Sequence, residues 1–521
     1  MTSAVAPIAS GFSRELRHTV GCLGSSRGVH FRRGRHPSRC PSASASTSNW
    51  EVDETGGVVF TVTELVAATG GELVHQGSPG SVSTDTRMVR PGQWFLALSG
   101  EQFDGEEFVG DALAGGCAGV ISCRPCPENW TAGYVQVDNT TQSLQDLASN
   151  VRDRFKGPMV GITGSVGKTT VRDLIALALG ETETHKTSGN LNNHIGLPLT
   201  ILRTPPNAKV CVLEMGMSVP GEIGTLVAIA RPSIRVVINV APAHLAGVGD
   251  IDGVARAKAE MFHCAVAGDV CVVNKDDTRV MAMCIPNQCS TVSFGRIGSG
   301  ADVEYDVDLE SDDDGDTVFA PATFTLQNKH ETTHVSLCEP GAHLAACAAC
   351  AAAVAVATGV PLETAGTRMS AFTSPKGRMR VCRSSASGIT VLDDAYNASP
   401  KSVANALLTL RNARDRGHRT VALLGDMLEL GEASHGLHID AVTLCLDAGF
   451  GVVGVAGDAF TSAATQLAAT RPDALDIVVA DDVDALWENV SDVASKEGSV
   501  VLVKGSRGMG MERIVERLIE G

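Results

Sequence analysis

Short, continuous apolar runs alternate along most of the chain with longer segments whose apolar residues recur at helical spacing. A run such as Val210–Leu213 is typical of a strand in a parallel sheet, where helices cover both faces. In the last third of the chain the runs are Ile389–Leu392, Val421–Leu424, Val452–Val455, Ile477–Val479 and Val500–Val503. Helical stretches such as Ser402–Arg411 separate them, and this alternation predicts an α/β protein that ends in a Rossmann-like parallel sheet.

The chain of 521 residues is too long for one ordinary core, and its pattern divides it into three domains. We expect a small N-terminal α/β domain over residues 57–150, a central parallel-sheet domain over 156–372 and a C-terminal Rossmann-like domain over 377–521. No apolar run reaches the ~18 residues that a membrane-spanning helix needs, so no membrane span is predicted.

Composition separates residues 1–48 from the rest of the chain. This segment holds seven arginines, many serines and a single acidic residue, Glu15. Such a composition is typical of an organelle transit peptide, and a merely disordered tail is the alternative. The whole chain carries a net charge of −17 and this segment carries +6, so the remainder carries −23. That acidic balance argues against nucleic acid and anionic membranes as partners.

The 15 cysteines are odd in number and scattered along the chain. The pairs Cys123–Cys126 and Cys347–Cys350 both have Cys-x-x-Cys spacing, but each lacks the second pair of ligands that a zinc site needs. We therefore interpret the cysteines as thiols of a protein in a reducing compartment.

The clearest chemical motif is the segment 161–170. It lies between the apolar pair Met159-Val160 and the segment 171–179, whose apolar residues recur at helical spacing. A strand, a glycine-rich turn and a helix start let backbone N–H groups converge on phosphates, while Lys168 reaches the outer phosphates and the Thr169 hydroxyl binds Mg²⁺. The general pattern has a glycine six residues before the lysine, where this chain has Ile162, and a chance Gly-Lys-Thr turn is the alternative. The residues assigned to ATP are Gly164, Ser165, Val166, Gly167, Lys168, Thr169 and Thr170.

Other candidate residues carry less weight when each is taken alone. Glu214 follows a buried strand, at the end where parallel sheets bind ligands, so it suits a metal ion; a carboxylate facing water is the alternative. His244 alone is more often a structural histidine, and Lys258 alone is more often an exposed helix lysine. The turn Ser83–Arg87 suits an anionic or sugar ligand, but it could equally be a solvated turn.

Three segments together resemble the Mur ligase family of ATP-dependent amide-forming enzymes. They read Thr-Gly-x-x-Gly-Lys-Thr-Thr, Asn-x-x-Pro-Ala-His-Leu and Val-Ala-Arg-Ala-Lys, and the likeness extends over about residues 57–521. The resemblance implies ATP, two Mg²⁺ sites and a carbamylated lysine, which offers an anionic oxygen to a metal. The implied metal ligands are Thr169, Glu214, His244 and carbamylated Lys258. The implied catalytic residues are Lys168, His244 and Lys258, and Arg378 and Asp394 are expected to reach ATP from the third domain.

Two strings near the end of the chain, Leu-Gly-Asp-Met-Leu-Glu-Leu-Gly at 424–431 and Lys-Gly-Ser-Arg at 504–507, resemble those of the family branch that joins D-alanyl-D-alanine to UDP-N-acetylmuramoyl-tripeptide. The implied reaction uses ATP to turn the tripeptide carboxylate into an acyl phosphate, which the dipeptide amine attacks. A site divided between two domains suggests that domain closure completes it and excludes water. The residues expected to contact the UDP substrate are Ser83, Thr84, Asp85, Thr86, Arg87, Asn192 and Asn193. We expect a monomer.

One segment departs from the family pattern. Mur ligases usually carry two asparagines in Gly-x-His-Asn-x-x-Asn, one of which helps to hold adenine, and this chain has Leu344 and Cys347 at those positions. ATP recognition at this helix is therefore in question. The alternatives are a folylpolyglutamate-synthase-like ligase, which lacks a domain like the one with Ser83–Arg87, and an inactive scaffold that binds a nucleotide sugar.

We predict that residues 1–48 are dispensable for activity and sufficient for import into the chloroplast stroma. Their Arg-rich, acid-poor composition is the reason. A plastid fits better than a mitochondrion, because the implied pathway belongs to bacteria and to plastids descended from them. The measurement is the location of a fluorescent protein fused to this segment, and a fusion that stayed in the cytosol would contradict the prediction.

Overall fold

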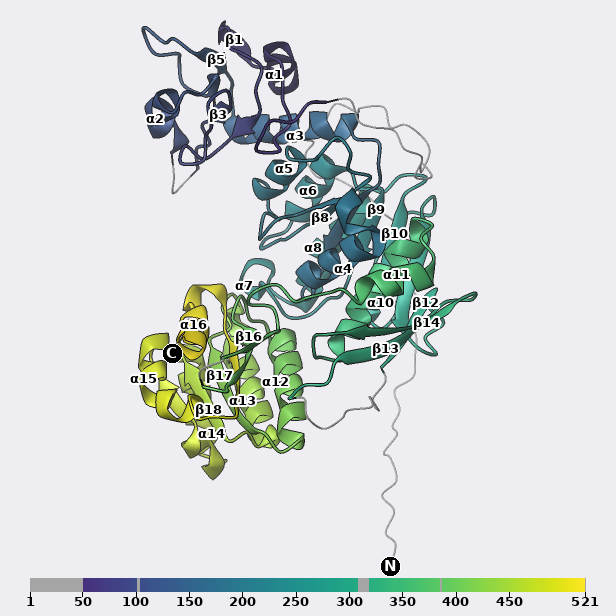
Figure 1. The fold of residues 1–521 in the computed structure, drawn as a ribbon, viewed down its shortest axis with the longest axis vertical. Helices are drawn as coiled ribbons and strands as arrows, with labels where there is room; N and C mark the ends of the chain where they lie inside the picture. The colour runs from purple at the N-terminus through teal and green to yellow at the C-terminus, as the bar shows by residue number, and fades with distance from the viewer. Residues whose placement is uncertain (1–49, 101–103, 308–317, 385–386, 521) are drawn as a thin grey trace, which may run out of the picture. The chain divides into compact units, whose positions relative to one another are not determined.

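The computed structural model describes residues 50–100, 104–307, 318–384 and 387–520. The predicted leader at 1–48 lies outside them. The described residues form three β-sheets, each with its own helices, so the α/β class is confirmed (Figure 1). The sheets lie in turn within 57–150, 156–372 and 377–521, although the exact domain boundaries stay a prediction. None of the described helices is long and apolar enough to span a membrane.

The first sheet has the strand order β1-β5-β4-β3-β2, and only β1 is antiparallel to its neighbour. Its strands are β1 (Glu72–His75), β2 (Val82–Ser83), β3 (Trp94–Leu96), β4 (Gly119–Ser122) and β5 (Gly133–Gln136). Its helices are α1 (Val62–Thr69), α2 (Val109–Ala114) and α3 (Thr140–Arg154). Helix α1 begins with a capping box, in which the side chains of Thr61 and Glu64 each accept the other's backbone N–H.

The second sheet has the order β14-β13-β12-β11-β10-β9-β6-β8-β7, and only β13 and β14 run antiparallel to their neighbours. Its strands are β6 (Met159–Thr163), β7 (Thr184–Lys186), β8 (Val210–Glu214), β9 (Ile234–Val237), β10 (Val270–Asn274), β11 (Ser290–Arg296), β12 (Val303–Val307), β13 (Ala322–Gln327) and β14 (Thr332–Leu337). Its helices are α4 (Lys168–Leu179), α5 (Gly196–Ile201), α6 (Glu222–Ala230), α7 (Leu245–Val248), α8 (Ile251–His263), α9 (Thr278–Met281), α10 (His343–Ala357) and α11 (Leu362–Met369). The alanine-rich α10 packs against α4, because its small side chains let the two helices approach closely.

The third sheet has the order β15-β16-β20-β17-β18-β19, with only β15 antiparallel. Its strands are β15 (Arg380–Arg383), β16 (Thr390–Asp394), β17 (Arg419–Gly425), β18 (Val452–Ala456), β19 (Val478–Ala480) and β20 (Ser499–Lys504). Its helices are α12 (Pro400–Asp415), α13 (Ser434–Ala448), α14 (Asp458–Ala468), α15 (Val483–Ala494) and α16 (Glu512–Glu520). The five apolar runs predicted as strands are all strands.

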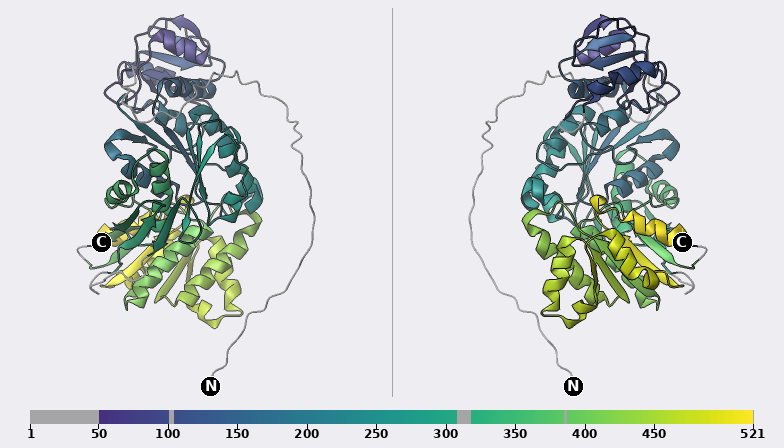
Figure 2. Two further views of the ribbon diagram at one scale, coloured as in Figure 1. Left: turned by 90° about the vertical axis from the view of Figure 1, so that its right-hand side faces the viewer. Right: turned by 90° about the vertical axis from the view of Figure 1, so that its left-hand side faces the viewer.

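Helices cover both faces of this third sheet (Figure 2). Leu392 and Leu502 pack into one apolar cluster with α12, α13 and α14, whereas Val391 and Val501 pack into another with α15 and α16. Because both faces are buried, the strands are apolar without alternation.

Three hydrogen-bonded groups hold the loop that follows β17. Asp426 accepts two backbone N–H groups at the start of α14, at 3.0 and 2.9 Å. The buried His438 accepts the Met427 N–H at 3.0 Å and donates from Nδ1 to a carbonyl of its own helix at 2.7 Å. The Ser506 hydroxyl accepts the Leu428 N–H at 2.8 Å. This loop is therefore a rigid support for the residues at its tip.

The fully buried ring of Trp94 packs directly on three glycines, Gly77, Gly119 and Gly133. We expect Gly133→Ala to destabilise the first domain by about 1–3 kcal/mol, the usual cost of overpacking. The reason is that a Cβ at Gly133 would lie 2.5 Å from the indole. Urea unfolding followed by tryptophan fluorescence measures the loss. Gly110→Ala in α2 is the matched control, because no atom lies within 4 Å of its Cβ position; equal unfolding midpoints would contradict the prediction.

We expect the stability of the folded chain to fall as the pH drops below 6.5, in part through His438. Burial lowers the pKa of His438 below its ordinary value of 6.5. The unfolded chain therefore binds a proton in a pH range where the folded chain does not, and this loss ends once the folded-state pKa is passed. Melting temperatures between about pH 8 and about pH 5 should fall less steeply for His438→Gln than for the wild type. His330→Gln, a change at an exposed histidine between β13 and β14, is the control; identical profiles for His438→Gln and wild type would contradict the prediction.

Candidate active site

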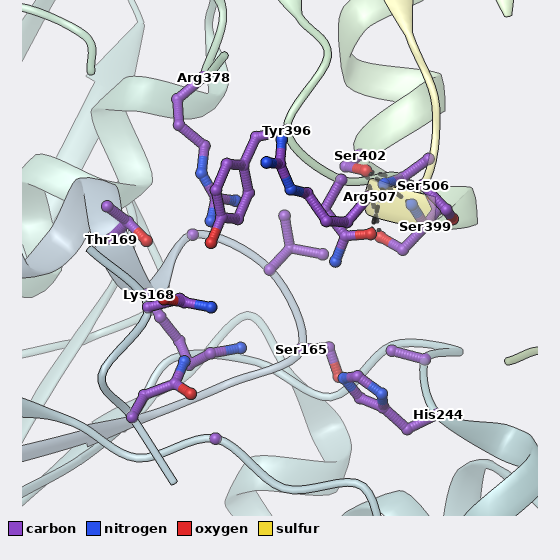
Figure 3. Close-up of a pocket in the computed structure, with 18 of the residues that line it drawn as sticks. Ser165, Lys168, Thr169, His244, Arg378, Tyr396, Ser399, Ser402, Ser506 and Arg507 are labelled. Atoms are coloured by element: carbon purple, nitrogen blue, oxygen red, sulfur yellow. Dashed lines mark hydrogen bonds between the residues drawn. The ribbon is translucent and has the colours of Figure 1, made fainter. Parts of the chain in front are cut away.

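A cavity of about 520 Å³ lies between the second and third sheets (Figure 3). Its walls are the loops that follow β6, β7, β8 and β9 of the second sheet, the start of α10, and the loops that follow β16, β17 and β20 of the third sheet. Parallel sheets bind ligands at this carboxyl end of their strands. The lining contains most of the predicted site residues: Ser165, Val166, Gly167, Lys168, Thr169, Thr170, Asn192, Asn193, Glu214, His244, Arg378 and Asp394. Gly164, Lys258 and Ser83–Arg87 are not part of it.

The predicted phosphate loop joins β6 to α4, and Asn239 just after β9 holds it in place. The Asn239 carboxamide oxygen accepts the N–H groups of Ser165 and Val166 at 3.1 and 3.0 Å, and its nitrogen donates to the Val166 carbonyl at 3.0 Å. The Ser165 hydroxyl donates to the Ala241 carbonyl at 2.9 Å. Gly167, the N-cap of α4, has φ of 90°, which a side chain would strain. The loop is thus preorganised before any ligand enters.

Lys168 opens α4 and folds back over the loop, where its ammonium donates to the Gly164 carbonyl at 2.8 Å. Loss of hydration lowers the pKa of Lys168, although the Glu214 carboxylate opposes this. The helix N-terminus and this ammonium both favour an anion at the loop. The helix N-terminus and the Lys168 ammonium together suit phosphate binding.

Thr169 and Glu214 together offer oxygen ligands that fit Mg²⁺. Glu214 ends β8 and is 2% exposed; one of its carboxylate oxygens accepts from Arg172 at 2.9 Å, and the other lies 3.4 Å from the Thr169 hydroxyl. Mg²⁺ usually takes only one or two oxygens from the protein and the rest from water and substrate phosphates. A hydroxyl and a carboxylate at the start of a phosphate-binding helix meet that requirement.

The second predicted metal site is not assembled from ordinary side chains. Among the residues that the structure describes, no three His, Cys, Asp or Glu side chains lie close enough to hold a metal ion. Lys258 in α8 is 2% exposed, and burial, together with the nearby Lys168 ammonium, lowers the pKa of its amine well below the ordinary 10.5. His244 lines the cavity, but its Nδ1 lies 2.5 Å from Glu429 Oε2, a partner from the third sheet.

Two arginines and a tyrosine form the wall that the third sheet contributes. The Tyr396 ring lies between Arg378 and Arg507, whose guanidinium carbons are 4.1 and 5.6 Å from the ring centroid (Figure 3). A tyrosine face attracts cations, so the ring holds both guanidinium groups at the cavity. This wall therefore carries positive charge.

Asp394 has a structural partner as well as its place in the lining. Its carboxylate pairs with the buried Lys504 ammonium at 2.5 Å and accepts the Met379 N–H at 3.2 Å. These bonds tie the Arg378 segment to β16 and β20. A direct contact from Asp394 to ATP stays a prediction.

The residues predicted to contact UDP do not come together in one pocket. Asn192 and Asn193 line the cavity, where Asn193 also accepts two backbone N–H groups at the start of α5, at 3.2 and 2.8 Å. The turn Ser83–Arg87 belongs to the first sheet and lies outside the lining. There Arg87 is 86% exposed and pairs with Asp85 at 2.7 Å, and its hydrogen bond lowers the pKa of Asp85. The UDP role of both sets stays a prediction.

The two positions that depart from the family pattern differ in their surroundings. Leu344 lines the cavity, whereas Cys347 packs beneath the phosphate loop, its sulfur 3.5 Å from the Cβ position of Gly167. Burial raises the pKa of the Cys347 thiol to about 12, so it acts as a small apolar group. Neither side chain offers the carboxamide that would bind a base.

Sequence reasoning gave no role to several residues that line the cavity. They are Tyr396, Glu429, Lys504 and Arg507. Each lies at or just past the carboxyl end of a parallel strand of the third sheet. Their position after these strands was the sequence feature that could have identified them, because ligands bind at the carboxyl ends of parallel strands.

The chain is similar to known protein families and to solved structures. Residues 162–355 match the Mur ligase middle domain, and residues 377–507 match the Mur ligase, glutamate ligase domain. The UDP-N-acetylmuramoyl-tripeptide–D-alanyl-D-alanine ligase of Bacillus subtilis is 33% identical over 452 residues, which cover 84% of this chain and 93% of that protein. MurF from Acinetobacter baumannii has 27% identity and a TM-score of 0.78, covering 89% of this chain and 100% of that one. MurF ligase from Thermotoga maritima in complex with ADP has 26% identity and a TM-score of 0.71, covering 85% and 97%. The chain therefore belongs to the Mur ligase family.

Proposed function

We propose that this chain is the ATP-dependent ligase that joins D-alanyl-D-alanine to the tripeptide carboxylate of UDP-N-acetylmuramoyl-tripeptide, a step of peptidoglycan synthesis. One observation carries the proposal: a preorganised phosphate loop and an arginine-bearing wall from another sheet line the same cavity. The Bacillus subtilis relative named for this reaction is matched over 93% of its own length. The family resemblance read from the sequence is confirmed.

The chemistry requires activation, because a carboxylate is a poor electrophile at neutral pH. A carboxylate oxygen attacks the γ-phosphorus of ATP, the bond to ADP breaks, and an acyl phosphate forms. The dipeptide amine, as the free base, then attacks the acyl carbon. The tetrahedral intermediate expels inorganic phosphate, and the proton of the amine passes to solvent. The products are the amide, ADP and phosphate.

The residues of the cavity have separate tasks in this reaction. The loop N–H groups and Lys168 bind the phosphates and oppose the charge that spreads over the transferring oxygens. Thr169 and Glu214 would hold Mg²⁺, which supplies further charge neutralisation when it is bound. Arg378 faces the cavity from the third sheet and stabilises the same negative charge.

The two walls come from different sheets, so the cavity is complete only while the two sheets are docked. Docking excludes water, which would otherwise hydrolyse the acyl phosphate before the amine reached it. The loop after β17 and the Tyr396 wall both belong to the part of the chain that forms the third sheet.

Lys258 is the one predicted ligand whose chemistry must change before it can act. A buried amine that is neutral can add to CO₂ and lose a proton, which gives a carbamate with anionic oxygens. Burial and the Lys168 ammonium both favour the neutral amine. We infer a carbamate at Lys258 on that ground, with His244 as its neighbour in the predicted second metal site.

Three further parts of the proposal rest on the sequence. The Ser83–Arg87 turn holds the UDP end of the substrate through exposed groups, and Asn192 and Asn193 contact the same substrate from the cavity. The acid-poor segment 1–48 directs the chain to the chloroplast stroma. The enzyme acts as a monomer.

The test is to incubate the chain with ATP, D-alanyl-D-alanine and UDP-N-acetylmuramoyl-tripeptide and to measure phosphate release and amide product. We expect release only when all three substrates are present. Release that needed no dipeptide would mark an ATPase, and binding of the nucleotide sugar without turnover would mark an inactive scaffold.

We expect Lys258→Ala to bind ATP nearly normally but to lose most of its turnover, because the proposed carbamate oxygens would be missing. Short carboxylic acids in the buffer should restore part of the rate by filling the same position. With ¹³C-bicarbonate the wild type should show a carbamate ¹³C resonance that Lys258→Ala lacks. Lys496→Ala, a change at an exposed lysine, is the matched control. Near-normal ligation by Lys258→Ala would remove the carbamate and the second metal site together.

A further inference from the structure

His244 and Glu429 meet where the second sheet contacts the third. The His244 Nδ1 lies 2.5 Å from Glu429 Oε2, and the Glu429 carbonyl accepts the Ala246 N–H at 3.1 Å. The two residues are 185 positions apart, and both line the cavity. Because a carboxylate only accepts hydrogen bonds, the imidazole donates from Nδ1.

Both residues have a left-handed backbone, with φ of 55° at His244 and 64° at Glu429. Only five non-glycine residues of the described chain have positive φ, and these two touch each other. Such a conformation costs about 1–2 kcal/mol per residue, and it persists where the surrounding structure enforces it.

The contact does not offset that cost through stability. The His244 and Glu429 side chains are 28% and 57% exposed, and exposed ion pairs contribute little to the free energy of unfolding. Strain that no stability gain explains is typical of functional positions. We therefore attribute the contact to the orientation of the His244 ring and not to stability.

The two sides of the contact differ in rigidity. Glu429 sits at the tip of the loop after β17, which Asp426, His438 and Ser506 hold by hydrogen bonds. His244 precedes a helix of only one turn, α7, and the Asn239 segment before it belongs to the phosphate loop support. The rigid loop is thus the part that can orient the imidazole.

We propose that Glu429 is a positioning residue for the ligase reaction, whose carboxylate fixes the His244 ring in the cavity while the second and third sheets are docked. With Nδ1 bonded to Glu429, Nε2 is the ring nitrogen presented to a ligand. Glu429 acts through His244 and touches no reacting atom. This inference rests on the proposed function for its kinetic consequences, but the contact can be tested without turnover.

The kinetic test compares Glu429→Ala and Glu429→Gln with Glu432→Gln, a matched change at an exposed acid three residues along. We expect Glu429→Ala to lower kcat about 10- to 100-fold, as loss of a ligand-orienting partner usually does. The KM values should change less than about threefold, because no substrate contact is lost. Glu429→Gln keeps an acceptor and should recover part of the rate, and Glu432→Gln should match the wild type. A wild-type kcat for Glu429→Ala would overturn the proposal.

A double-mutant cycle with His244→Gln separates positioning from a general structural effect. If Glu429 acts through His244, Glu429→Ala should cost almost nothing further in the His244→Gln background. Fully additive effects would overturn the proposal. Melting temperatures serve as the folding check, and Glu429→Ala should stay close to the wild type because its side chain is largely exposed.

The third measurement needs no activity, nucleotide or metal. The ¹⁵N signals of the His244 ring, assigned by their absence in His244→Gln, should shift in Glu429→Ala at fixed pH and stay unchanged in Glu432→Gln. An unshifted ring would overturn the proposal even in an active enzyme. If the wild type formed no amide product, the proposed function would fail, and the ring signals alone would decide this inference.

Discussion

The hydrogen bonds of Asn239 are the contact on which the site depends. This one carboxamide binds both the N–H groups and a carbonyl of the phosphate loop, and thereby fixes the loop to the end of β9. Five residues further along the same segment, His244 contacts Glu429 of the third sheet. A single stretch of chain therefore joins the phosphate-binding group to the wall that closes over it. The loop geometry and the docking of the two sheets cannot be set independently.

Local patterns in the sequence were enough to predict most of the fold. The apolar runs of the third sheet became strands because both faces of that sheet are covered, as an unbroken run requires. The phosphate loop was also predictable from the sequence, because its glycines, its lysine and the flanking strand and helix are contiguous. Glu214 was selected by a rule that needs only the boundaries of the strand it follows.

The remaining features of the site depend on contacts between residues far apart in the sequence. Nothing local to Glu429 or His244 indicates that they pair across 185 positions. Likewise, nothing in the sequence near Asp394 indicates that its carboxylate pairs with Lys504, 110 positions away. The contact of Arg507 with the Tyr396 ring also arises only because β16 and β20 lie side by side. The sequence shows which polar residues follow the strands at the edge of a sheet. Which of these residues pair with each other depends on how the chain packs.

Two buried lysines show how burial and neighbouring charges determine the protonation of an amine. Lys504 is 1% exposed and Lys258 is 2% exposed, and burial lowers the pKa of both amines. For Lys504 the Asp394 carboxylate opposes this effect, because it provides the buried ammonium with a counter-ion. At Lys258 no carboxylate among the described residues does so, and the Lys168 ammonium adds to the penalty. A charged amine there would be an uncompensated buried ion, and the neutral form relieves that cost. The neutral amine is also the form that reacts with CO₂, so the burial of Lys258 supplies the condition that its proposed modification requires.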